Sequence, residues 1–126
     1  MSIANVMLVD DEVPFVETMS KRLIRRELNI TTAFSGEEAL KKLDEDQGIE
    51  VIILDVKMPG IDGIETLRQI KIKYPITEVI MLTGHGDMRS VEEGMNNGAF
   101  EYIMKPVDIG ELTIKINKAW KKKQSV

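Results

Sequence analysis

Four short runs of apolar residues recur along the chain, and a polar or charged residue directly follows each of them. The runs are Val6–Val9, Val51–Leu54, Val79–Leu82 and Tyr102–Met104. Continuous apolar runs of this length are typical of strands that a parallel sheet buries on both faces. Residues 30–34, with two threonines and a phenylalanine, fit a fifth strand nearer an edge of the sheet. The pattern therefore predicts five strands.

Segments with the apolar spacing of amphipathic helices lie between and after these runs. Three of the predicted helices begin with a capping residue and have glutamate three positions later, which is the spacing of a capping box. The pairs are Ser35 with Glu38, Asp62 with Glu65, and Asp108 with Glu111. Asp87 fits as the cap of another helix that ends near Asn97 and Gly98, where glycine can take the left-handed conformation.

Strands that alternate with helices need crossover connections, and right-handed crossovers lead to a mainly parallel sheet covered on both faces. The predicted fold is therefore an α/β, doubly wound, five-stranded parallel sheet with five helices. The flavodoxin-like strand order 2-1-3-4-5 places the first strand beside the third. With 126 residues, the chain is expected to form a single domain over residues 1–126.

Composition excludes several classes of protein. The chain is 43% hydrophobic and 30% charged, as in ordinary globular domains. It has no cysteine, which excludes disulfides and cysteine-ligated zinc and suits a reducing, cytoplasmic location. No apolar run approaches the ~20 residues that cross a bilayer, so no membrane contact is expected. A net charge of -4 predicts no direct contact with nucleic acid.

The residues that directly follow the apolar runs carry the candidate chemistry. Asp10 and Asp11 follow the first run, Asp55 the second, Thr83 the third and Lys105 the fourth. In doubly wound sheets ligands bind at the carboxyl ends of the strands, so we expect these side chains to meet. Converging carboxylates need a cation, and a set of oxygen ligands that can share a phosphate suits Mg²⁺.

A hydroxyl and an ammonium group opposite a metal site suit phosphoryl transfer, which depends on positioning and charge neutralisation more than on covalent help. A carboxylate can act as the nucleophile by forming an acyl phosphate. Asp55, at the middle of the set, is the natural candidate. Thr83 and Lys105 would donate to the phosphoryl oxygens, and the backbone at Gly84 could approach them closely because glycine lacks a side chain.

These residues resemble the response-regulator receiver domains of two-component phosphorelay signalling. That family has an acidic pair, an acceptor aspartate, a threonine or serine, and a Lys-Pro. The matching residues here are Asp10, Asp11, Asp55, Thr83, Lys105 and Pro106. The resemblance covers essentially the whole chain and includes the stretch from Asp55 to Gly60 and the stretch from Gly98 to Pro106.

The resemblance implies a function and a set of roles. Asp55 would accept a phosphoryl group from a sensor histidine kinase or a phosphotransfer protein, in a signalling domain that assists its own phosphotransfer and dephosphorylation rather than acting as an enzyme. Asp11 and Asp55 would bind Mg²⁺ directly, Asp10 through water, and Lys57 through its backbone carbonyl. Thr83 and Lys105 would hold the phosphoryl oxygens, the Gly84 amide would donate to them, and the bond between Lys105 and Pro106 would be cis.

The resemblance also implies a switch. Tyr102 stands three positions before Lys105, where receivers carry an aromatic residue that changes rotamer as the threonine moves toward the phosphoryl group. We expect phosphorylation to change the face formed by the fourth helix, fifth strand and fifth helix. An output domain or target protein would bind there, and a phosphorylation-linked homodimer is a further possibility. Lys57 and His85 resemble residues that tune phosphoryl lifetime.

Simpler interpretations stand beside these. Asp10 and Asp11 could simply cap the first helix, and Asp11 could do so in addition to its role in the site. Lys105 could be a solvated lysine and Thr83 a turn residue. The alternative function is a magnesium-dependent phosphohydrolase of the aspartyl-phosphate type, but its Asp-x-Asp pattern would need an aspartate where Lys57 stands. A nucleotide- or flavin-binding module would need a glycine-rich loop after the first strand, and the sequence has none there.

Overall fold

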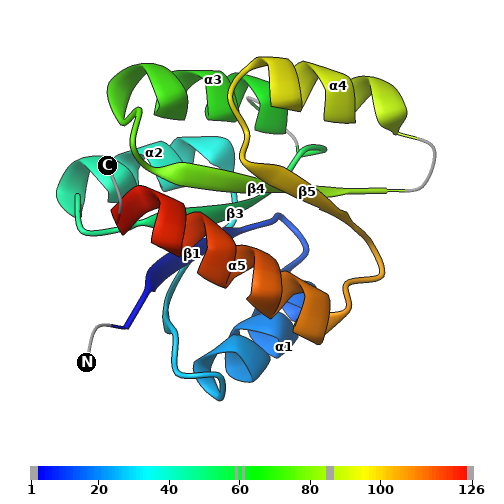
Figure 1. The fold of residues 1–126 in the computed structure, drawn as a ribbon. Helices are drawn as coiled ribbons and strands as arrows, with labels where there is room; N and C mark the ends of the chain where they lie inside the picture. Colours follow the sequence, from blue (N-terminus) through cyan, green and yellow to red (C-terminus); the bar gives the residue numbers. More distant parts are fainter. Residues whose placement is uncertain (1–2, 59, 61, 85–86, 125–126) are drawn as a thin grey trace.

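A parallel sheet of five strands in the order β2-β1-β3-β4-β5 forms the centre of the molecule (Figure 1). The structure is a computed structural model that describes residues 3–58, 60, 62–84 and 87–124. Its strands are β1 (Asn5–Val9), β2 (Asn29–Ala33), β3 (Val51–Asp55), β4 (Glu78–Thr83) and β5 (Glu101–Met104). The predicted strands and their order are confirmed, and their ends differ from the prediction by at most one residue.

Helices cover both faces of this sheet. In Figure 1, α1 and α5 lie on one face, and α2, α3 and α4 lie on the other. The helices are α1 (Val13–Ile24), α2 (Gly36–Glu45), α3 (Gly63–Lys73), α4 (Met88–Asn96) and α5 (Ile109–Gln124). The predicted doubly wound α/β fold is confirmed. Within the described residues, no helix has both the length and the apolar character that a bilayer crossing requires.

Two apolar cores hold the layers together, one on each face of the sheet. Leu8 and Ile53 pack with α1 and α5, whereas Met7 and Ile52 pack on the opposite face with α2 and α3. Neighbouring residues of a strand point to opposite faces, so a strand that is covered on both sides must be apolar throughout. Each fully buried aliphatic side chain stabilises the fold by about 1.5–3 kcal/mol. The strand ends that carry the candidate site are therefore held on a rigid base.

Two of the predicted helix caps are confirmed and a third differs in detail. Ser35 Oγ accepts from the Glu38 amide at 3.0 Å, and Asp62 Oδ1 accepts from the Glu65 amide at 2.9 Å. Asp108 Oδ1 accepts from the amide of Gly110 at 2.9 Å, not from that of Glu111. The helix begins at Ile109, so Asp108 occupies the N-cap position and bonds to the second helical amide.

Of the two other capping predictions, one is confirmed in position only and one is wrong. Asp87 is the N-cap residue of α4, but its side chain accepts no capping hydrogen bond from the described part of the chain. Its backbone, at φ -96° and ψ 47°, lacks the extended conformation that an N-cap usually has. Asp11 does not cap α1, because the N-cap residue of that helix is Glu12. Gly98 has the expected left-handed conformation, with φ +99°.

Candidate functional site

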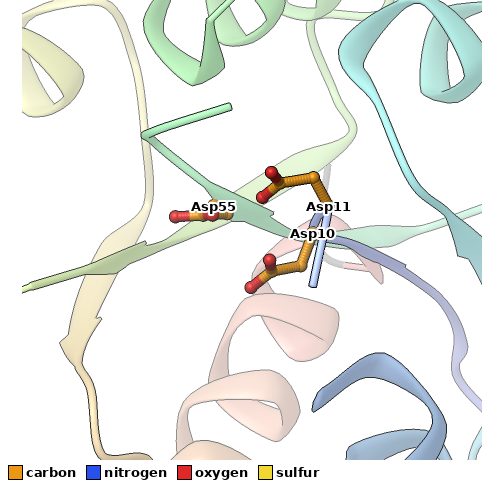
Figure 2. A group of neighbouring side chains, drawn as sticks. All are labelled: Asp10, Asp11 and Asp55. Atoms are coloured by element: carbon orange, nitrogen blue, oxygen red, sulfur yellow. The ribbon is translucent and has the colours of Figure 1, made fainter. Parts of the chain in front are cut away.

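Three carboxylates meet at the carboxyl edge of the sheet. Asp10 and Asp11 follow β1, and Asp55 is the last residue of β3. The two strands are neighbours, with Val9 paired to Leu54, so their ends lie side by side. One oxygen of each aspartate lies within 4.8 Å of the others, and Figure 2 shows the three side chains pointing toward a shared space. A cluster of oxygen donors at this spacing could hold a divalent cation.

The carboxylates of this cluster repel one another. Asp10 is fully buried, Asp55 is 7% exposed, and Asp11 is exposed to solvent. Burial and the neighbouring charge of Asp10 raise the pKa of Asp55 to about 7, although Lys105 and the Lys57 amide act in the opposite direction. The Lys57 amide donates to Asp55 Oδ1 at 3.3 Å. A cation in the shared space would relieve this repulsion, so these residues fit a metal ion.

Lys105 supplies the positive charge that was predicted at the end of β5. Its Nζ atom lies 2.7 Å from Asp10 Oδ2 and 3.9 Å from Asp55 Oδ2. Burial alone would lower the pKa of Lys105, but its hydrogen bonds to Asp10 and Glu12 raise it above the usual value. The peptide bond between Lys105 and Pro106 is cis, as expected. The interpretation of Lys105 as an ordinary solvated lysine is therefore wrong.

Thr83 and Gly84 lie at the end of β4, next to β3 in the sheet. Thr83 is 1% exposed, and its Oγ1 atom has no hydrogen-bond partner among the described residues. A buried hydroxyl usually has a partner, so this one is available to an incoming acceptor. A Cβ atom at Gly84 would meet no described atom within 4 Å. Packing against the described residues therefore does not require glycine at this position.

Tyr102 lies on β5 two strands away from Asp55, and β4 separates them. It is paired with Met81 in the sheet, and its half-buried side chain packs against the core on the α2 and α3 face. Lys115 of α5 donates to the Tyr102 carbonyl oxygen at 2.7 Å and lies 5.5 Å from the centre of its ring. Tyr102 therefore lies between the strand of Thr83 and α5, although a change of rotamer stays a prediction.

The two predicted tuning residues differ in what can be said of them. The side chain of Lys57 is 78% exposed, and its Nζ atom lies 3.9 Å from Asp87 Oδ2. The predicted role of its backbone carbonyl stays a prediction. His85 lies outside the described residues.

The sequence interpretation missed two residues near the lysine. Glu12 Oε1 accepts a hydrogen bond from Lys105 Nζ at 2.9 Å, and the centre of the Phe15 ring lies 4.6 Å from the same nitrogen. A signal for Glu12 was present in the sequence, because it extends the acidic pair to three consecutive acids. Phe15 shows only the spacing of a core residue, so nothing in the sequence linked it to the lysine.

Comparison with known proteins identifies the family. Residues 6–117 match the family model of the response regulator receiver domain. The chain belongs to the response regulator receiver family. This receiver is 35% identical to the DNA-binding transcriptional regulator NtrC of Klebsiella pneumoniae over 112 residues, which is 89% of this chain and 24% of that protein. It is 30% identical to the transcriptional regulatory protein ZraR of Escherichia coli K12, covering 91% of this chain and 26% of that one.

Solved receiver structures have the same fold. A response regulator receiver domain protein from Clostridium thermocellum superimposes with a TM-score of 0.93 at 38% identity, covering 97% of this chain and 98% of that one. A CheY-like receiver from Methanospirillum hungatei JF-1 gives a TM-score of 0.92 at 26% identity, with 98% of both chains covered. The receiver fold and its place in two-component signalling are thus shown.

The curated relatives are longer proteins, and the chain spans about a quarter of their length. The NtrC relatives are named as DNA-binding proteins. The comparison does not show that the quarter of NtrC that matches this chain is the part that binds DNA. The predicted lack of direct contact with nucleic acid therefore concerns residues 1–126 alone and stays a prediction.

Proposed function

We propose that this receiver accepts a phosphoryl group on Asp55 in a magnesium-dependent reaction. The observation that carries the proposal is the geometry at the sheet edge. One oxygen of each of three carboxylates lies within 4.8 Å of the others, and Lys105 Nζ lies 3.9 Å from Asp55 Oδ2. Such a site has a nucleophile, a place for a cation and a donor for the phosphoryl oxygens, which is the machinery that phosphoryl transfer needs.

Mg²⁺ would be held by Asp11, Asp55 and the backbone carbonyl of Lys57, and by Asp10 through water. When bound, it would neutralise charge on the carboxylates and on the phosphoryl oxygens. An indirect role for Asp10 is supported by its hydrogen bonds, because its Oδ1 accepts from the Glu12 amide at 3.0 Å and its Oδ2 accepts from Lys105. Both carboxylate oxygens of Asp10 therefore already accept a hydrogen bond, which favours contact with the ion through water.

In the transfer step, an oxygen of Asp55 forms a bond to phosphorus as the phosphorus–nitrogen bond of a phosphohistidine donor breaks. The leaving imidazole nitrogen keeps the electron pair of that bond and can take up a proton from solvent. Lys105 Nζ and Thr83 Oγ1 donate to the phosphoryl oxygens, and the Gly84 amide adds a backbone donor. The unpartnered hydroxyl of Thr83 supports this assignment. The same site would promote the later hydrolysis of the acyl phosphate.

Output would run through Thr83 and Tyr102 to the face formed by α4, β5 and α5. Movement of Thr83 toward the phosphoryl group would let Tyr102 change rotamer and shift the population of conformations at this face. Support comes from the position of Tyr102, which pairs with β4 and contacts Lys115 of α5. An output domain or target protein would bind there, and a phosphorylation-linked homodimer could use the same surface.

The partner on the input side would be a sensor histidine kinase or a phosphotransfer protein, as membership of the receiver family implies. Residues 1–126 would act as one receiver domain without contacting nucleic acid or a membrane. A cytoplasmic location suits a sequence without cysteine.

The test is labelling by a small phosphodonor such as acetyl phosphate, with and without Mg²⁺. The parent should take up one phosphoryl group in the presence of Mg²⁺, and Asp55→Asn should take up none. Asp46→Asn removes the same charge from an exposed position in a loop and should label like the parent. Label retained in Asp55→Asn would contradict the proposal. Steady turnover of phosphomonoesters by the parent would favour a phosphohydrolase instead.

A further inference from the structure

The ammonium group of Lys105 lies nearer to two other carboxylates than to the proposed acceptor. Its Nζ atom is 2.7 Å from Asp10 Oδ2, 2.9 Å from Glu12 Oε1 and 3.9 Å from Asp55 Oδ2. The contacts with Asp10 and Glu12 are hydrogen bonds, whereas the contact with Asp55 is an ion pair at longer range. Two of the three N–H groups of Lys105 are therefore engaged by carboxylates other than Asp55.

Glu12 is well placed to hold this resting position. It is the N-cap residue of α1, and its amide donates to Asp10 Oδ1 at 3.0 Å, so its backbone is fixed beside the site. The centre of the Phe15 ring, one turn further along α1, lies 4.6 Å from the ammonium nitrogen of Lys105. A cation that contacts a carboxylate and an aromatic face together is stabilised by both.

Of the two hydrogen bonds that Lys105 makes to carboxylates, the one to Glu12 costs less to break. The side chain of Asp10 is fully buried, and loss of its ammonium partner would leave a buried charge uncompensated. The side chain of Glu12 is 63% exposed, so water can replace the ammonium group there at little cost. An incoming phosphoryl group therefore competes for Lys105 mainly with Glu12.

We propose that Glu12 is a positioning residue that holds Lys105 in a resting state, and that phosphorylation draws the ammonium group away from it. This inference rests on the proposed phosphoryl-acceptor function. Glu12 contacts neither the acceptor nor the phosphoryl group and acts through the lysine alone. The strength of the contact between Glu12 and Lys105 thus sets how readily the site takes up a phosphoryl group.

The first test measures binding of beryllofluoride, a phosphoryl mimic, to the magnesium-loaded protein by calorimetry. Glu12→Gln should bind it about three- to ten-fold more tightly than the parent, the factor expected for one partly exposed charged hydrogen bond. Glu17→Gln makes the same charge change on an exposed residue of α1 and should match the parent. Equal affinity in parent and Glu12→Gln would overturn the proposal.

A second measurement separates a hold on the lysine from simple repulsion of an anion by Glu12. In a Lys105→Ala background, all binding is weaker, and the added substitution Glu12→Gln should have no further effect. If Glu12→Gln still tightens binding without the lysine, its charge acts directly on the anion and the proposal is wrong.

A third measurement needs no phosphoryl mimic. In the metal-free protein, the ammonium hydrogens of Lys105 should exchange slowly in nitrogen-15 NMR spectra, because two carboxylates hold them. Glu12→Gln should speed this exchange and Glu17→Gln should not. If the ammonium hydrogens of Lys105 exchange equally fast in Glu12→Gln and in the parent, Glu12 does not hold the lysine and the proposal is wrong, even if Asp55 is phosphorylated normally. Failure of the parent to bind beryllofluoride, with the exchange effect present, would count against the proposed function and leave the contact of Glu12 with Lys105 supported.

Discussion

At the scale of single residues, the chemistry of this receiver depends on a carboxylate kept among like charges. The pKa of Asp55 is raised to about 7 because the group is buried and lies beside Asp10. Lys105 offsets this effect only in part, since its hydrogen bonds go to Asp10 and Glu12. The metal-free site is therefore electrostatically unfavourable at neutral pH, and a cation would stabilise it.

This imbalance predicts that Asp55→Asn stabilises the metal-free protein in a pH-dependent way. The folded-state pKa of about 7 lies above the model value of 3.8, so the parent favours the protonated carboxyl when folded. Its stability should fall as the pH rises from about 4 to 7. Asparagine does not titrate, so the variant should be more stable than the parent by about 2 kcal/mol at pH 8.

The measurement is urea unfolding in a chelator at pH 4 and pH 8. The gain of Asp55→Asn over the parent should be small at pH 4, and Asp46→Asn should show no such pH dependence. Saturating Mg²⁺ at pH 8 should stabilise the parent more than Asp55→Asn, because ligand binding to the folded state alone raises stability. If Asp55→Asn gains the same stability over the parent at both pH values, the pKa of Asp55 is not raised in the folded protein.

At the scale of secondary-structure elements, the start of α3 fixes the strand end that carries Asp55. Gly63, the first residue of α3, donates its amide to the Val56 carbonyl oxygen at 3.1 Å. A Cβ atom at Gly63 would lie 2.3 Å from the backbone oxygen of Asp55 and 2.4 Å from the Cα of Val56. Because both are backbone atoms, the helix can approach β3 this closely only with glycine at its start.

We therefore expect Gly63→Ala to be strongly destabilising although alanine favours helices. The added methyl group must displace the backbone of Asp55 or Val56, at a cost of about 3 kcal/mol. Uptake of label from acetyl phosphate should fall as well, because the acceptor carboxylate moves.

The matched control is Gly110→Ala in the first turn of α5, where the contact of an added Cβ atom with the described residues would be Asp108 Oδ1 at 3.4 Å. This variant should be as stable as the parent or slightly more stable. Thermal unfolding of both variants would decide the point. Equal stability of Gly63→Ala and the parent would show that β3 and α3 can separate freely.

At the scale of the whole molecule, the path from the site to the opposite edge of the sheet crosses β4 and β5. Thr83 ends β4, Tyr102 lies on β5, and Lys115 connects Tyr102 to α5. The helix on the other side, α4, buries only Val91 and Gly94 among its residues. Few buried contacts allow an element to shift at low cost, so this half of the molecule is the one suited to respond.

We predict that magnesium and beryllofluoride together shift the NMR signals of Tyr102, α4 and α5 more than those of β2. Thr83→Val keeps the shape of the side chain but removes its hydroxyl, so the shifts at Tyr102 and α4 should shrink by about half or more as the threonine loses its attraction to the mimic. Thr32→Val on β2 is the matched control and should respond like the parent. Full shifts in Thr83→Val would show that coupling runs by another route.

Local patterns in the sequence determined most of the fold and the identity of the central site residues. Apolar runs marked four of the strands, and residues that favour strands marked the fifth at residues 30–34. The polar residues after the apolar runs marked the carboxylates, Thr83 and Lys105, because strand burial and parallel topology act on residues a few positions apart. The caps at Ser35 and Asp62 were predictable for the same reason.

Only the tertiary structure decided which of these groups touch. Lys105 and Glu12 are 93 positions apart, and their 2.9 Å contact depends on how α1 sits against the end of β5. The lack of a capping bond at Asp87 and the close approach at Gly63 likewise depend on how each helix meets the sheet. Sequence spacing sets periodicity and topology, whereas contacts between distant residues are set by packing at the scale of one ångström, to which hydrogen bonds and steric overlap are both sensitive.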